Sequence, residues 1–422
     1  MKRAKLVTVL GRVCLLIVFT TLFFGSANSV SGQEKGGVPK IGILIPLTGP
    51  SASIGEHCRR GAILAAEEIN ATGGILGRKI ELVFADDESN PAVGVAAAER
   101  LITKDNVDIV AGTYNSSVCL AVMDVPAKYG IPYIGGGATS DQIGLKRASD
   151  PKRFRAFYKP ASPSYVYGQM WTWFLEFMLN ENLYKPESKN ITIVNENSAW
   201  GNAITDAIKK YLSESDLSKK GFKIVLADQV PHSETDFLAE ISKIKAYKPG
   251  IVFGIFAAVP TNSAFQKQFV NAGIKVPVFS VYTPNNPEFL SVTGPAANGL
   301  IWNSVMNLLP TKEGKHFREA IQKRFQKDVE VVGSMVYDSI YMIKEGYERA
   351  GSFDKEKFLT EMDKTRHVGA AGVYVFDPKT HESIAGEDYI VSLAYQIQDG
   401  KSMIIWPKKH AEAKYTVPSW MK

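Results

Sequence analysis

The chain has little cysteine, little histidine and no strong excess of charge. Its 422 residues include three cysteines and six histidines, and the formal net charge is +6. Removing residues 1–27 takes away four basic residues and no acidic one, which lowers this charge to +2. A nearly balanced charge gives no electrostatic footprint for nucleic acid, and so few cysteines cannot form a disulfide framework. Cys58 and Cys119 can pair only if the fold brings them together.

Motifs that carry catalysis or hold a cofactor are also missing. The sequence has no His-Glu-x-x-His, no Gly-x-Ser-x-Gly, no phosphate-binding Gly-x-x-x-x-Gly-Lys and no dinucleotide-binding Gly-x-Gly-x-x-Gly. His232 and His381 have acidic residues nearby, which is typical of solvated surface pairs. The acidic run at residues 86–88 follows an expected strand, and a charged loop explains it as well as a metal site does. We therefore expect no enzyme activity, no metal site and no cofactor.

Only one long apolar run is present, and it lies near the N-terminus. Lys2, Arg3 and Lys5 precede an apolar stretch from Val13 to Phe24, and small residues follow it. This pattern predicts a secretory signal peptide over residues 1–27 that is cleaved on export, which indicates a periplasmic protein. Cys14 precedes the apolar run, so lipid attachment at a lipoprotein site is not expected. No later segment reaches the roughly 18 apolar residues that a membrane helix needs.

From residue 38 onward, short apolar strands alternate with helical stretches. Residues 40–46 and 80–84 are typical of buried strands, and the helix expected over residues 55–70 lies between them. A second alternating series begins near residue 166 and runs to about residue 281. Further helices are expected between residues 312 and 363, and strand-like segments close the chain. Strict alternation predicts parallel sheets covered by helices on both faces, in two lobes.

Several motifs then show a resemblance to a known family. The opening Ile41-Gly-Ile-Leu-Ile-Pro-Leu-Thr-Gly-Pro50, followed by Arg60-Gly61 and by the run from Glu68 to Arg78, resembles the branched-chain amino-acid-type solute-binding proteins of ABC transporters. Gly201 after an aromatic residue agrees with it, as do Val336-Tyr-Asp338, Phe376-Asp377 and Gln398-Asp-Gly400. The resemblance covers about residues 41–400, in order along the chain.

The resemblance implies the type I periplasmic-binding fold, with two doubly wound lobes joined by a three-strand hinge. Lobe one would hold residues 38–157 and 304–367, and lobe two residues 158–303 and 368–422. A small solute would bind in the cleft between them, and the hinge would close around it. The partners implied are that solute and a membrane ABC permease, with the protein acting as a monomer and binding no nucleic acid. A ligand-sensing receptor of the same fold, without a transport role, is the alternative.

Ligand-binding residues are expected at the carboxyl ends of strands, where helix N-termini offer free N–H groups to an anion. Residues 114–117 and 135–140 both follow strands and carry hydroxyls and glycines. Lobe two offers an aromatic side chain before Gly201 and a further strand end near residue 282. The predicted ligand-binding residues are Ser116, Ser117, Gly137, Ala138, Thr139, Tyr165, Trp200, Tyr282, Thr283 and Tyr337.

The loop over residues 279–286 departs from the family pattern. Amino-acid-binding members often carry a glutamate in this loop to pair with the ligand's ammonium group, and here the loop has none. A buried ammonium without a carboxylate costs several kcal/mol. An organic acid, an aromatic carboxylate or an amide therefore stands beside an amino acid as the expected solute.

Overall fold

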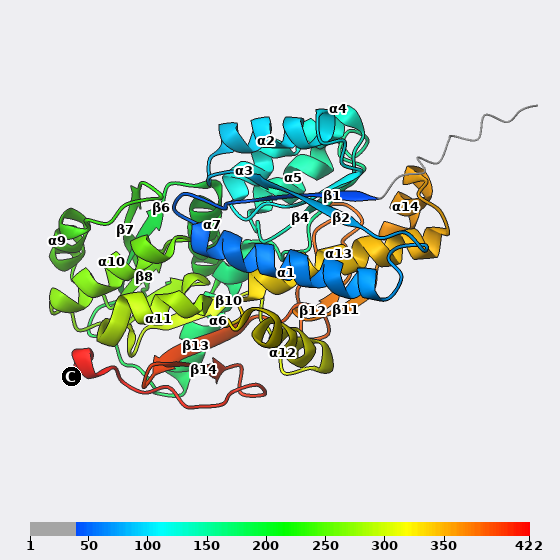
Figure 1. The fold of residues 1–422 in the computed structure, drawn as a ribbon. Helices are drawn as coiled ribbons and strands as arrows, with labels where there is room; N and C mark the ends of the chain where they lie inside the picture. Colours follow the sequence, from blue (N-terminus) through cyan, green and yellow to red (C-terminus); the bar gives the residue numbers. More distant parts are fainter. Residues whose placement is uncertain (1–38) are drawn as a thin grey trace, which may run out of the picture. The chain divides into compact units, whose positions relative to one another are not determined.

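The structure is a computed structural model that describes residues 39–422. The predicted signal peptide over residues 1–27 lies outside the described residues. The described residues belong to one compact unit in which helices cover two sheets (Figure 1). No helix in the described part of the chain is long and apolar enough to cross a membrane.

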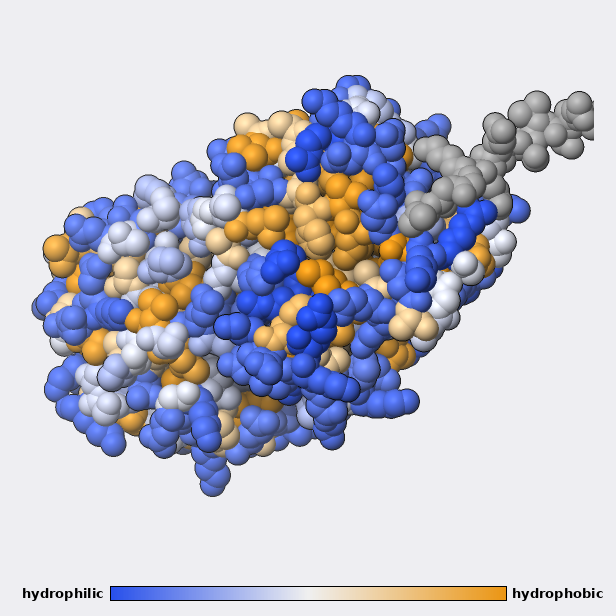
Figure 2. Space-filling view, viewed as in Figure 1, coloured by the Kyte–Doolittle hydropathy of each residue, from blue (hydrophilic) through white to orange (hydrophobic). Residues whose placement is uncertain are grey.

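The first sheet contains five parallel strands in the order β2-β1-β3-β4-β5. Its central strands β1 and β3 are apolar except for Lys40 at the start of β1, as expected for strands that helices cover on both faces. The edge strand β2 is different: Leu82, Val83 and Phe84 are only partly buried, and Figure 2 shows apolar surface along it. The strands are β1 (Lys40–Ile45), β2 (Glu81–Asp86), β3 (Ile109–Gly112), β4 (Tyr133–Gly135) and β5 (Phe157–Tyr158).

Helix α2 of this part begins where its sequence predicts, whereas α1 begins at Ala52, three residues before the expected start. Asn90 accepts hydrogen bonds from the Ala92 and Val93 N–H groups and Pro91 occupies the first turn, so α2 starts there. The helices packed around the first sheet come from two parts of the sequence, and the last three of them come from its later part. They are α1 (Ala52–Ala71), α2 (Pro91–Thr103), α3 (Ser116–Val122), α4 (Asp124–Tyr129), α5 (Asp141–Ser149), α12 (Lys312–Phe325), α13 (Val331–Ala350) and α14 (Lys355–Met362).

The second sheet contains seven strands in the order β14-β13-β10-β9-β8-β6-β7. Five are parallel, and β13 and β14 add an antiparallel edge, which agrees with the alternating apolar and polar residues of the closing segments. These strands are β6 (Asn190–Glu196), β7 (Lys223–Val230), β8 (Ile251–Ile255), β9 (Val278–Val281), β10 (Ile301–Ser304), β13 (Leu393–Gln398) and β14 (Lys401–Trp406). The helices around it are α6 (Tyr165–Asn180), α7 (Ala199–Glu214), α8 (Asp216–Lys219), α9 (Leu238–Tyr247), α10 (Val259–Asn271) and α11 (Pro287–Thr293).

The chain passes three times between the two sheets. It crosses after β5, after β10 and again after a small hairpin of β11 (His367–Gly369) and β12 (Gly372–Tyr374). Asp338 of α13 holds this hairpin, because its carboxylate accepts hydrogen bonds from the Ala370 and Ala371 N–H groups and the Tyr374 hydroxyl. Two doubly wound units joined by three crossovers are the predicted fold class, which is confirmed.

Cys58 and Cys119 are both buried and unpaired. Cys58 belongs to the apolar cluster that α1 and α13 form, whereas Cys119 belongs to the cluster under α2 and α3. The two thiols therefore contribute to separate parts of the core, and no disulfide joins them.

Candidate functional site

A cavity of about 230 Å³ lies where the carboxyl ends of strands from both sheets meet. The first sheet contributes the segments after β2, β3 and β4, and the second contributes those after β6, β7, β8 and β9. This is the position at which open α/β sheets bind small ligands. The lining residues are Ser89, Pro91, Tyr114, Asn115, Ser116, Ser117, Gly137, Tyr167, Glu196, Asn197, Ser198, Trp200, His232, Ala257, Tyr282 and Met306.

On the first-sheet side, Ser116 is placed to donate a hydrogen bond into the cavity. Its Oγ accepts the N–H groups of Thr139 and Ser140, each at 3.1 Å, so its hydroxyl hydrogen is left for another acceptor. Ser116 and Ser117 open α3, and N–H groups of a helix's first turn have no partner within the helix. Gly137 lines the same cavity, and a side chain does not fit there because a Cβ would lie 2.8 Å from a Val332 methyl group. This wall suits an oxyanion.

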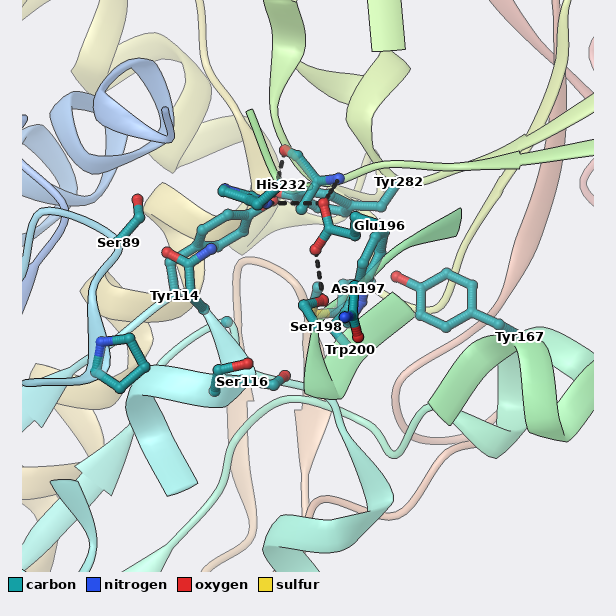
Figure 3. Close-up of a pocket in the computed structure, with 16 residues that line it drawn as sticks. Ser89, Tyr114, Ser116, Tyr167, Glu196, Asn197, Ser198, Trp200, His232 and Tyr282 are labelled. Carbon is teal, nitrogen blue, oxygen red and sulfur yellow. Dashed lines mark hydrogen bonds and ion pairs between the residues drawn. The ribbon is translucent and has the colours of Figure 1, made fainter. Parts of the chain in front are cut away.

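On the second-sheet side, the Glu196 carboxylate is at the centre of a hydrogen-bond network (Figure 3). Its Oε1 accepts from the Ser198 hydroxyl at 2.6 Å, and its Oε2 accepts from the Ala257 N–H and lies 2.8 Å from His232 Nδ1. Burial lowers the pKa of His232, but the Glu196 carboxylate more than offsets this, so the pKa is raised above its ordinary value. The network therefore favours an imidazolium paired with a carboxylate.

Four aromatic side chains enclose the cavity. Tyr114 and Tyr282 lie with ring centroids 5.9 Å apart, and Tyr167 meets Trp200 edge-on at 6.4 Å. Tyr282 has φ of +52°, a conformation that bulky residues adopt rarely and that is often found at functional sites. Its hydroxyl donates to Glu330 Oε1 at 2.5 Å. The four rings therefore give the cavity an apolar surface beside the polar groups of Ser116 and Glu196.

Direct hydrogen bonds join the two sides around the cavity. The Ala199 N–H donates to Ser117 Oγ at 3.1 Å, and the Tyr114 hydroxyl donates to the Ala257 carbonyl at 3.2 Å. Farther out, Asn286 Nδ2 donates to Ser53 Oγ at 2.9 Å. These contacts hold the strand ends of the two sheets close together in this structure.

Five of the predicted ligand-binding residues line this cavity. They come from four separate segments of the chain, two on each side. The five are Ser116, Ser117, Gly137, Trp200 and Tyr282.

Three other predicted residues lie just behind the cavity wall instead. Ala138 and Thr139 are fully buried, and the Thr139 hydroxyl is 3.1 Å from that of Ser164, so neither side chain lines the cavity. Thr283 is also fully buried, and its hydroxyl donates to the Phe256 carbonyl. These three buried residues support the wall from behind, since none of them lines the cavity.

Two predicted tyrosines lie away from the cavity. Tyr165 begins α6 and is 43% exposed in a surface groove on the other side of that helix. Tyr337 packs on Phe317, and its hydroxyl donates to Glu68 Oε2 at 2.6 Å, between α13 and α1. Tyr165 follows the first crossover and Tyr337 lies inside α13, and in both helices the phase points the side chain away from the cavity.

The sequence-based interpretation of two histidines was wrong. His232 lines the cavity and pairs with buried Glu196, and His381 is only 4% exposed, with Nδ1 2.8 Å from the Phe157 carbonyl oxygen.

Tyr114, Tyr167 and Glu196 were not predicted as site residues. Position gives the available signal for two of them, because Tyr114 follows β3 by two residues and Glu196 is the last residue of β6. Among residues 39–422, no group of three or more His, Cys, Asp or Glu side chains could hold a metal ion.

Comparison with known proteins agrees with this geometry. The sequence profile of the periplasmic binding protein family matches residues 39–398. The chain belongs to this family. The Leu/Ile/Val-binding protein homolog 3 of Brucella melitensis is 28% identical over 317 residues, which cover 74% of this chain and 80% of that protein. The predicted family is therefore confirmed.

Solved structures of this family share the fold. A leucine binding protein from Thermotoga maritima has a TM-score of 0.74 and 20% identity, covering 87% of this chain and 97% of that one. A solute binding protein of an ABC transporter from R. palustris, in complex with benzoate, has a TM-score of 0.73 and 20% identity, covering 91% and 99%. Two proteins that bind chemically different solutes thus have the same fold as this periplasmic binding protein.

Proposed function

We propose that this periplasmic binding protein is the exported solute-binding component of an ABC uptake system. It captures a small carboxylate, amino acid or amide between its two lobes by hinge closure and delivers it, as a monomer, to a membrane permease. The observation that supports this most directly is the enclosed cavity at the strand ends, with hydrogen bonds from one side to the other around it. Capture needs such a geometry, because contacts from both sides hold the solute only when the lobes close.

The Ser116 side of the cavity supports a carboxylate as the polar end of the solute. The Ser116 hydroxyl and the first-turn N–H groups of α3 are donors, and a carboxylate bound by several such donors is well stabilised. The aromatic rings of Tyr114, Tyr167 and Trp200 then suit an apolar or aromatic body.

The buried carboxylates near the cavity bear on the choice between an amino acid and a simple acid. Glu196 already accepts from three protein donors, and Glu330 accepts from Tyr282, Asn285 and the Val332 N–H. An ammonium group on the solute would have to share these acceptors. The arrangement therefore favours an aromatic or branched carboxylate that needs no carboxylate partner of its own, with an amino acid as the second candidate.

A ligand screen on the chain without residues 1–27 tests this proposal. The protein is unfolded and refolded to remove any bound solute, then mixed with amino acids, amides, aromatic acids and dicarboxylates. We expect one class to raise the unfolding midpoint and to change Trp200 fluorescence with a stoichiometry of one. If no compound of these classes binds, the proposed solute chemistry is wrong.

Ser116→Ala should weaken the binding of the selected solute by about 1–3 kcal/mol, because the variant removes a buried hydrogen bond to its carboxylate. Titration calorimetry measures this change. Ser213→Ala, at an exposed serine on α7, is the matched control and should bind as the wild type does. An unchanged dissociation constant in Ser116→Ala would remove this serine from the site.

A further inference from the structure

A second cavity, of about 220 Å³, lies apart from the solute cavity on the far side of β5. It is lined by Arg147, Arg155, Asp363, Phe376, Pro378 and His381, none of which lines the solute cavity. These residues come from α5, the segment before β5, the end of α14 and the loop after β12. Segments far apart in the sequence therefore converge on a site that contains two guanidinium groups.

Arg147 is the unusual member of this site, because it is 5% exposed and forms no ion pair with an acidic residue in the described part of the chain. Its Nη1 donates to the Lys379 carbonyl at 2.8 Å, and its Nη2 lies 2.6 Å from His381 Nε2. Its buried Nε has no hydrogen-bond partner within residues 39–422. Burying a cation without a counter-ion is costly, so Arg147 is a charge that an anion would compensate.

His381 cannot supply that negative charge, and it does not compete for the anion as a cation. Its Nδ1 faces the Phe157 carbonyl, which only accepts, so Nδ1 carries the hydrogen and the bare Nε2 accepts from Arg147. Burial and the Arg147 charge lower the pKa of His381 to about 4, in agreement with a neutral ring. The ring is held in place by stacking on Tyr158 at 4.5 Å.

The carboxylates near Arg147 already accept hydrogen bonds from other groups. Asp363 makes two bonds to Arg155, at 3.1 and 2.6 Å, and also accepts the Tyr158 hydroxyl. Asp377 accepts from the Lys379 and Thr380 N–H groups of its own turn. With His381 neutral, the charged lining residues are two arginines and one aspartate, which leaves one positive charge in the cavity.

We propose that this cavity is a binding site for a small oxyanion of the phosphate or sulfate type. Guanidinium groups bind such oxyanions through paired N–H donors, and Phe376 and Pro378 close the remaining wall. The site also adjoins the crossovers: the Lys159 N–H donates to the His381 carbonyl at 2.8 Å, and the Ser383 N–H donates to the Lys159 carbonyl at 2.9 Å. An anion held here therefore stabilises the strands that connect the two lobes.

The experiment compares inorganic phosphate with chloride at constant ionic strength, using the chain without residues 1–27. Phosphate at 10 mM should raise the unfolding midpoint by on the order of 1–3 °C. Arg147→Gln should abolish this shift. Arg153→Gln should keep it, because Arg153 lies on the surface, pairs with Asp124 and does not line the cavity.

Ser116→Ala separates this site from the solute cavity and should keep the phosphate shift. Loss of the shift in Ser116→Ala, its persistence in Arg147→Gln, or no shift in the wild type would each overturn the proposal. If Arg147→Gln does not fold, Arg147→Lys preserves the charge without the planar fork. Calorimetry should then show phosphate binding at least about tenfold weaker than in the wild type, and unchanged binding would be evidence against the site.

Discussion

Among single residues, Asp87 is a buried carboxyl group that the fold does not neutralise with a cation. It is fully buried, its Oδ1 accepts from the Ser89 N–H, and its Oδ2 has no hydrogen-bond partner among the described residues. Burial raises its pKa from 3.8 to about 7. Its protonated form is therefore favoured in the folded state, and this contribution to stability is lost as the pH rises from about 3.8 through about 7.

Asp87→Asn removes this titration. We expect the free energy of unfolding of the variant, relative to the wild type, to increase by about 2–3 kcal/mol between pH 5 and pH 8. Denaturant unfolding of both proteins at the two pH values measures this change. Any cost of the amide that does not depend on pH cancels when the two pH values are compared. Glu88→Gln, at an exposed neighbour, should show almost no such change. A pH-independent difference for Asp87→Asn would mean that the carboxyl group titrates normally.

The individual site residues also show what sequence can predict. Ser116 comes shortly after β3 and Trp200 shortly after β6. Their position at the cavity could therefore be predicted from the local sequence pattern alone. The pairing of His232 with Glu196 joins two strand ends 36 residues apart and depends on which strands are neighbours. The side-chain direction of Tyr165 depends on helix phase to within one residue, and sequence patterns rarely fix a helix start that closely.

At the scale of elements, α1 and α13 pack unusually closely. A Cβ on Gly61 would lie 2.0 Å from the Gly333 carbonyl oxygen, and a Cβ on Gly333 would lie 2.7 Å from the His57 carbonyl oxygen. Two glycines thus let the backbones of the two helices touch. This explains physically why Arg60-Gly61 is among the motifs that carry the family resemblance, although sequence alone gave no reason for it.

Gly61→Ala should therefore separate the two helices. We expect the free energy of unfolding to fall by roughly 2–4 kcal/mol, although alanine favours a helix by about 1 kcal/mol over glycine, because overpacking against backbone cannot relax by a side-chain movement. Chemical denaturation measures this loss. Ala71→Ser, at the exposed end of α1, should change stability by less than about 0.5 kcal/mol. A stabilised Gly61→Ala variant would show that the helix contact is looser than described.

For the whole molecule, sequence predicted the two sheets and the alternating elements because strand and helix periodicity is local. It could not predict how the two sides touch, because that depends on contacts between segments 82 to 233 residues apart. Asn286 of the second-sheet side donates to Ser53 of α1 on the first-sheet side, a sequence separation of 233 residues. Asn286 is fully buried in this arrangement, so its amide depends on Ser53 as an acceptor.

Ser53→Ala tests whether such contacts stabilise closure without touching the solute. The variant leaves the Asn286 amide buried and without its Ser53 acceptor only in the closed state, at a cost of about 1–3 kcal/mol. Since Ser53 does not line the cavity, solute affinity should fall about fivefold or more through the closing equilibrium alone, mainly by faster release. Small-angle scattering with saturating solute should show a larger open fraction for Ser53→Ala than for the wild type.

Ser213→Ala, with the same chemical change on an exposed helix face, should leave both the affinity and the scattering curve unchanged. If Ser53→Ala also binds and scatters as the wild type does, closure does not depend on this contact, and the lobes are held together by the bonds around the cavity itself.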